Sequence, residues 1–97
     1  SDQVVAVVRE ELIELEAEIA VNNSAAIEDE LGDLLFSCVN LARHLSVDPE
    51  QALRKANHKC QRRFEAMENL AARSGSDFSL LSTEQMEVLW AEVKLSE

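Results

Sequence analysis

The chain has 97 residues and a formal net charge of −10 at pH 7. This length suits a single domain with one modest core, so we expect residues 1–97 to form one domain. The acidic excess argues against a nucleic-acid or anionic-membrane partner. Two glycines and one proline leave few helix breakers, which predicts an all-α fold.

The compartment is predicted from what the sequence lacks and from its two cysteines. No stretch approaches the roughly 18 apolar residues that a membrane span needs, and no secretory signal opens the chain. Cys38 and Cys60 fall on apolar helical stripes, which is typical of reduced core thiols. We therefore expect a cytoplasmic protein that does not insert into membranes, with a disulfide between the two cysteines as the alternative.

The first predicted helix covers residues 2–21. Its apolar positions fall within about 100° of a helical wheel. They are Val4, Val5, Val8, Leu12, Leu15 and Ile19. Glu11, Glu14 and Glu18 form a stripe beside this face, with Glu11 nearest to the core edge. Two asparagines then end the helix, and Ser24 is the predicted N-cap of the next one.

The second predicted helix, residues 25–45, is apolar on nearly all sides. Its main face consists of Ile27, Leu31, Leu34, Cys38, Leu41 and Leu45. Phe36 and Val39 point well away from that face. A helix of this kind must be covered on most sides, which predicts an oligomer, most simply a two-fold homodimer. Glu30 and Asp33 form a polar seam together with Ser37 and Asn40.

Clear capping signals mark the last two helices. Asp48 is the predicted N-cap of the third helix, with Pro49 at its first position and Gln51 completing a capping box. This helix continues through Arg73 and ends near Gly75. Its inward positions are predicted to be Leu53, Ala56, Cys60, Phe64, Met67 and Leu70. Ser82 and Gln85 cap a short fourth helix, which carries Met86, Leu89, Trp90 and Val93.

Two acidic pairs indicate a metal site. In Glu11/Glu14 and Glu30/Asp33 the carboxylates are three residues apart, so each pair shares one helical face. If the two helices face each other, four acids meet, and they need a positive charge to remain together. Carboxylates with no His or Cys nearby favour Mg²⁺, with Mn²⁺ as the substitute. The alternative is a set of solvated surface glutamates.

Lys59 and Arg63 lie four residues apart on the third predicted helix. Opposite a carboxylate–metal cluster, such residues would bind the oxygens of a polyphosphate. The alternative is that both are solvated or paired with acids. Trp90, the one tryptophan, is either a core anchor or a platform for a nucleobase.

Five segments together carry a resemblance to a known family. They are EELIE at residues 10–14, EDELGDLLF at 28–36, VNLARHL at 39–45, KANHKCQRRF at 55–64 and MEVLWAEVK at 86–94. With them the chain resembles the MazG family of nucleoside triphosphate pyrophosphohydrolases, and in particular the C-terminal catalytic domain of two-domain members. The resemblance implies a four-helix bundle-like domain that assembles as a homodimer or a higher oligomer.

The resemblance also implies an activity and roles for residues. Glu11, Glu14, Glu30 and Asp33 resemble the magnesium ligands and catalytic carboxylates, Lys59 and Arg63 the triphosphate contacts, and Trp90 a nucleotide contact. The implied reaction hydrolyses a nucleoside triphosphate to the monophosphate and pyrophosphate, in nucleotide-pool housekeeping. The competing hypothesis is a non-catalytic helical assembly module, or a nucleotide sensor, on the same scaffold. The intact set of four acids argues against an assembly module.

Overall fold

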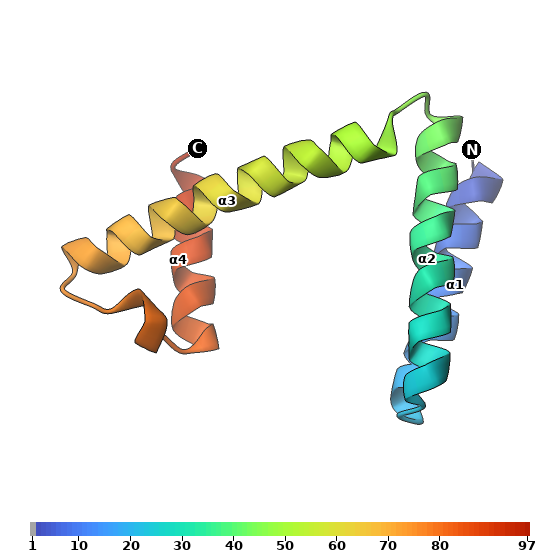
Figure 1. Ribbon diagram of the computed structural model, residues 1–97, viewed down its shortest axis with the longest axis horizontal. Coiled ribbons are helices and arrows are strands. Elements are labelled where there is room, and N and C mark those ends of the chain that lie inside the picture. The colour runs from blue at the N-terminus through green and yellow to red at the C-terminus, as the bar shows by residue number, and fades with distance from the viewer. Residues whose placement is uncertain (1) are drawn as a thin grey trace. The chain divides into compact units, whose positions relative to one another are not determined.

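The computed structural model describes residues 2–97 and contains helices and no strand in that range. The chain forms α1 (Asp2–Ala20), α2 (Ser24–His44), α3 (Pro49–Arg73), a 3-10 helix η1 (Phe78–Leu80) and α4 (Thr83–Leu95), as Figure 1 shows. The all-α prediction is confirmed. No helix between residues 2 and 97 is both long enough and apolar enough to cross a membrane.

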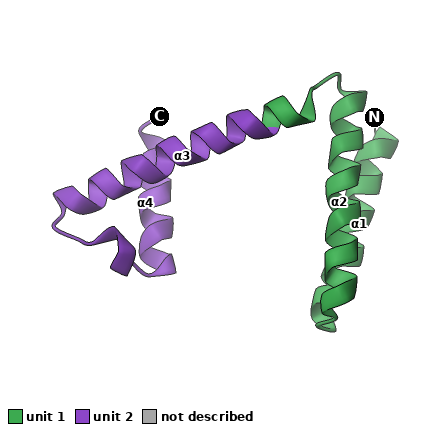
Figure 2. Ribbon diagram, in the orientation of Figure 1, with its two compact units in different colours: residues 1–52 green, residues 53–97 purple. Residues whose placement is uncertain are grey.

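The chain divides into two compact units, coloured separately in Figure 2. Unit 1 ends at Ala52, and unit 2 comprises Leu53–Glu97. Unit 1 contains α1 and α2 with the first residues of α3, and unit 2 contains the rest of α3, η1 and α4. The prediction that residues 1–97 form a single domain stays a prediction.

In unit 1, α1 and α2 lie side by side as a helical hairpin (Figure 1). The turn between them contains Asn22 at a φ of 55°, a left-handed conformation that asparagine tolerates better than most residues. The side-chain oxygen of Asn23 accepts a hydrogen bond from the N–H of Ala26 at 3.2 Å. Asn23 is therefore the N-cap of α2. The prediction of Ser24 is wrong by one residue, because asparagine caps as well as serine does.

The core of unit 1 is narrower than the sequence predicts. Leu15 is buried at its centre, but Leu31, Cys38 and Leu45 of the predicted main face of α2 are exposed. A single neighbouring helix covers only part of a face as wide as this one. Phe36 of α2 is 74% exposed. The apolar surface of α2 is therefore larger than α1 covers.

Local capping sets the ends of α3 and α4. The predicted N-cap Asp48, the terminator Gly75 and the capping box of α4 are confirmed, and a capping box at α3 completed by Gln51 stays a prediction. Asp48 accepts hydrogen bonds from the N–H groups of Glu50 and Gln51 at 3.0 and 3.2 Å, ahead of α3. Gly75 follows α3 with a φ of 75°, a conformation that glycine adopts without strain. The N–H of Gln85 donates to the Ser82 hydroxyl, and the N–H of Ser82 donates to the Gln85 side chain. This reciprocal pair is the predicted capping box of α4.

In unit 2, α3 and α4 meet through a small apolar core and an aromatic group. Met67, only 1% exposed, is buried with Ala71 of α3 and Val93 of α4. The ring centroid of Phe64 lies 5.8 Å from that of Trp90 and 6.5 Å from that of Phe78. The α3 position predicted to begin the inward face, Leu53, is instead exposed. The buried part of α3 is therefore its C-terminal half.

Both cysteines are free thiols, and neither is buried. Cys60 is half-buried on α3, whereas Cys38 is exposed on α2. The prediction of core thiols is wrong for Cys38, because that position lies on the part of the α2 face that α1 does not cover. The alternative of a disulfide between them is not what the structure shows.

Candidate functional site

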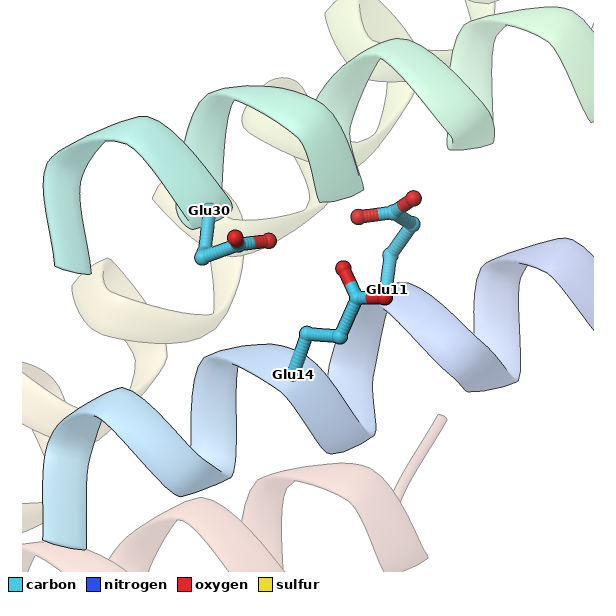
Figure 3. A group of neighbouring side chains, drawn as sticks. All are labelled: Glu11, Glu14 and Glu30. Atoms are coloured by element: carbon cyan, nitrogen blue, oxygen red, sulfur yellow. The ribbon is translucent and has the colours of Figure 1, made fainter. Parts of the chain in front are cut away.

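Three glutamates meet between the two helices of unit 1. Glu11 and Glu14 extend from α1 toward Glu30 of α2, as Figure 3 shows. One carboxylate oxygen from each lies within 4.8 Å of the others. The spacing of three residues along α1 puts Glu11 and Glu14 on the face that meets α2, as the sequence predicts. Three of the four predicted metal ligands therefore lie within the reach of a single cation.

The fourth predicted ligand, Asp33, belongs to an adjoining group on α2. Oxygens of Asp29, Glu30 and Asp33 also lie within 4.8 Å of one another, so Glu30 is common to both groups. Sequence reasoning missed Asp29, although Asp29 and Asp33 are four residues apart and share a helical face. We refer to Glu11, Glu14, Glu30 and Asp33 as the acidic cluster.

Burial without a partner distinguishes two members of the acidic cluster. Glu11 and Glu30 each have a buried Oε2 atom for which residues 2–97 supply no hydrogen bond. A buried carboxylate oxygen without a donor or a cation is costly. Desolvation by burial, followed by the charge of Glu14, raises the pKa of both Glu11 and Glu30 above the ordinary value. The charge of Asp33 raises both pKa values further.

This arrangement fits a hard divalent cation. The donor set consists of carboxylate oxygens from two helices, which are the ligands that such ions prefer. A cation would give these two oxygens the partner that residues 2–97 do not provide, and it would neutralise the repulsion that raises the pKa values. The acidic cluster is therefore the candidate metal centre of unit 1.

A cavity of about 370 Å³ adjoins the acidic cluster within unit 1. Glu11 and Asp33 form part of its wall, together with Ser37, Asn40 and the ring of Phe36. Ser37 is buried, and its hydroxyl donates to the carbonyl oxygen of Leu34 at 2.8 Å. The polar seam predicted along α2 thus continues from the acidic cluster into a cavity that is open to a ligand.

The predicted substrate contacts come together in unit 2. The Arg63 guanidinium lies 5.2 Å from the centroid of the Trp90 ring, in a cation–π arrangement. Nε and Nη2 of Arg63 also donate to the two carboxylate oxygens of Glu97, at 2.7 and 2.9 Å. Lys59, one turn before Arg63 on α3, is exposed. That Lys59 and Arg63 face the acidic cluster stays a prediction.

Sequence reasoning did not identify Glu97 as a neighbour of the predicted substrate contacts. Glu97 is 34 residues from Arg63, and no motif links the two. The hydrogen bonds from Arg63 lower the pKa of Glu97, and the same pairing raises the pKa of Arg63. Phe64, predicted only as an inward-facing residue, packs against Trp90 in the same group.

Comparisons with known proteins agree on one family. Residues 1–67 match the MazG nucleotide pyrophosphohydrolase domain. The chain is 48% identical over 82 residues to a nucleoside triphosphate pyrophosphohydrolase of Escherichia coli, covering 84% of the chain and 31% of that protein. It is 44% identical over 87 residues to the nucleoside triphosphate pyrophosphohydrolase/pyrophosphatase MazG of Thermotoga maritima, covering 90% of the chain and 33% of that protein.

A third relative, the uncharacterized protein YabN of Bacillus subtilis, is 41% identical over 71 residues, which are 73% of the chain and 14% of that protein. The chain thus spans about a third or less of the length of these curated relatives. The matched region includes all four residues of the acidic cluster as well as Lys59 and Arg63. The chain belongs to the MazG nucleotide pyrophosphohydrolase domain family.

Proposed function

We propose that the chain catalyses the Mg²⁺-dependent hydrolysis of nucleoside triphosphates to nucleoside monophosphate and pyrophosphate, as part of nucleotide-pool housekeeping. The observation that carries the proposal is that Glu11 and Glu30, beside Glu14, each bury a carboxylate oxygen with no hydrogen-bond partner among residues 2–97. The names of the E. coli and T. maritima relatives support the same reaction class.

In this proposal the acidic cluster holds Mg²⁺, with Mn²⁺ as a substitute. A divalent cation held there would supply positive charge beside the triphosphate and would make water easier to deprotonate. The protein's own contribution is to fix the carboxylates from two helices on one side of the substrate. Because the ligands lie on regular helices, their positions are set by the packing of α1 against α2 rather than by a loop.

Basic and aromatic side chains of unit 2 are assigned to the substrate. Lys59 and Arg63 bind phosphate oxygens and stabilise the charge that develops on them. Trp90 provides an apolar face for the nucleoside. A water oxygen forms a bond to the α- or the β-phosphorus while the bond from that phosphorus to the oxygen that bridges the two breaks, which leaves the monophosphate and pyrophosphate. A carboxylate of the acidic cluster accepts the proton that the water loses.

The proposal includes assembly as a homodimer, or as a higher oligomer, in the cytoplasm. Its basis is the uncovered apolar surface of α2, where Leu35, Phe36 and Val39 are all exposed. A contiguous apolar surface of this kind is typical of an interaction site. The symmetric use of this surface by two copies would remove Phe36 from water in both.

The test is pyrophosphate release from a panel of nucleoside triphosphates with and without Mg²⁺. We expect metal-dependent release with the monophosphate as co-product, and we expect Glu14→Gln to abolish it. Glu28→Gln is the matched control, because Glu28 is an exposed glutamate of α2 outside the acidic cluster. A folded protein that releases no pyrophosphate from any substrate would instead favour the assembly module or the nucleotide sensor.

A further inference from the structure

The Glu97 carboxylate makes a two-point contact with Arg63. Nε–H and an N–H of Nη2 donate to its two oxygens at 2.7 and 2.9 Å. This is the geometry with which an arginine side chain binds two oxygens of a phosphate group. The other N–H groups of the guanidinium lie outside the pair.

Two further basic residues of α3 act on the same carboxylate. The hydrogen bonds from Arg63 are the largest cause that lowers the pKa of Glu97, and the charges of Lys59 and Arg62 lower it further. Glu97 thus places one anion in the combined field of three cations. Lys59 and Arg63 are two residues to which the proposed function assigns phosphate binding.

We propose that the Glu97 carboxylate occupies the position of a phosphate group on Arg63, and that a polyphosphate displaces it on binding. This inference rests on the proposed function and adds a residue that sets the affinity for substrate. Carboxylate and phosphate oxygens are both acceptors for the same arginine donors, so the two anions compete for a single position.

The surroundings of Arg63 and Glu97 keep the free-energy cost of displacing the Glu97 carboxylate low. The Arg63 side chain is only 15% exposed, and its contact with the Trp90 ring does not involve Glu97. Glu97 is 44% exposed and follows the end of α4, so its side chain can rotate into water without disturbing a helix. Arg63 therefore remains in position for an incoming phosphate.

The experiment compares wild-type protein with Glu97→Gln, which removes the charge and keeps the size. The probes are the dissociation constant for inorganic tripolyphosphate, measured by calorimetry, and KM for a hydrolysed nucleoside triphosphate. We expect both to fall by about two- to fivefold, the effect of losing one ion pair at the protein surface. Glu92→Gln is the matched control, because Glu92 is an exposed glutamate of α4 and its substitution changes the net charge by the same amount.

A second comparison uses the Arg63→Ala background. There we expect Glu97→Gln to lose its effect, and an equal gain in affinity would overturn the inference by showing a general charge effect. Weaker tripolyphosphate binding by Glu97→Gln would also overturn it, since Glu97 would then support Arg63 rather than compete. The inference would also be overturned if Glu97→Gln left tripolyphosphate binding unchanged, or if neither the wild type nor Glu97→Gln bound tripolyphosphate. Tighter tripolyphosphate binding without nucleotide hydrolysis would contradict the proposed function alone.

Discussion

Glu11 of α1 and Glu30 of α2 each bury one carboxylate oxygen that no hydrogen-bond donor within residues 2–97 satisfies. Both are close to Glu14, whose charge adds to the cost of ionising them. Without a cation, this part of unit 1 opposes its own folding, because burial and repulsion both favour the protonated acids. The stability of the hairpin should therefore depend on metal and on pH in a definite way.

Glu30→Gln should raise the thermal stability of the metal-free protein and should remove its response to Mg²⁺. The substitution takes away one negative charge from the acidic cluster and with it a ligand. Thermal unfolding monitored by circular dichroism, with and without Mg²⁺, measures both effects. Glu28→Gln should keep the wild-type response, and a full Mg²⁺ response in Glu30→Gln would remove Glu30 from the metal site.

Metal binding should release protons and should weaken as the pH falls. The pKa values of Glu11 and Glu30 are raised in the folded state, so the folded protein binds protons that the unfolded chain has already lost. In the metal-free protein these two groups therefore oppose folding less as the pH falls from neutral toward the ordinary glutamate value of about 4.3. A bound cation reverses the shift, because it favours the charged carboxylates.

Calorimetric titration of Mg²⁺ in two buffers with different ionisation enthalpies measures this proton release directly. We expect a net release in the wild type that becomes smaller in Glu30→Gln. Binding with no proton release at any pH below neutral would show that these carboxylates are already ionised without metal, contrary to the environment that raises their pKa values.

Asn23→Ala should lower the free energy of unfolding by about 1 kcal/mol, the usual contribution of an N-cap side chain. Its amide oxygen accepts the hydrogen bond from the N–H of Ala26 at the start of α2. Ser24→Ala is the matched variant and should have a much smaller effect, since Ser24 is already inside the helix. Urea unfolding of the two variants decides between the adjacent positions, and the reverse order of effects would restore Ser24 as the cap.

Lys59→Ala should raise KM by roughly tenfold, because a hydrogen bond to a charged phosphate oxygen is lost. Steady-state kinetics over a range of substrate concentrations separates KM from kcat. Lys55→Ala is the control, since Lys55 is an exposed lysine one turn earlier on α3. Equal kinetics for wild type and Lys59→Ala would exclude Lys59 from the substrate site.

Phe36→Glu should convert the protein to a monomer if α2 forms the interface between copies. A charge on this exposed ring position opposes burial of the surrounding apolar surface. Light scattering combined with size-exclusion chromatography gives the molar mass. Ala25→Glu, an exposed position in the first turn of α2, introduces the same charge and should leave the mass unchanged. An oligomer that survives Phe36→Glu must use a different surface.

Features set by neighbours in the sequence could be predicted, and features set by distant contacts could not. Asp48, Gly75 and Ser82 act within a few residues of themselves, so their roles at helix ends follow from local chemistry. The N-cap of α2 was misplaced because Asn23 and Ser24 are equally suitable cap residues. The exposure of Leu31 could not be read from periodicity, which identifies an apolar face but not how much of it a neighbour covers.

In the candidate site, too, contacts set by local spacing could be predicted and contacts between distant residues could not. Glu11 and Glu14 share a face because of helical spacing, so their association was predictable, and Asp29 could have been found from its spacing to Asp33. The contact joins Arg63 of α3 to Glu97, which follows α4, and no periodic pattern relates two residues 34 positions apart. It required the fold of unit 2.

The acidic cluster also has a topological property. Its residues lie on two helices joined by a turn of a few residues, so they are close along the chain before they are close in space. The chain entropy lost on closing a loop grows with loop length, and for this hairpin the loss is small. A cation held by the acidic cluster would therefore cross-link two helices that are neighbours in the sequence. It would favour the pairing of α1 with α2 without contacts from distant parts of the chain.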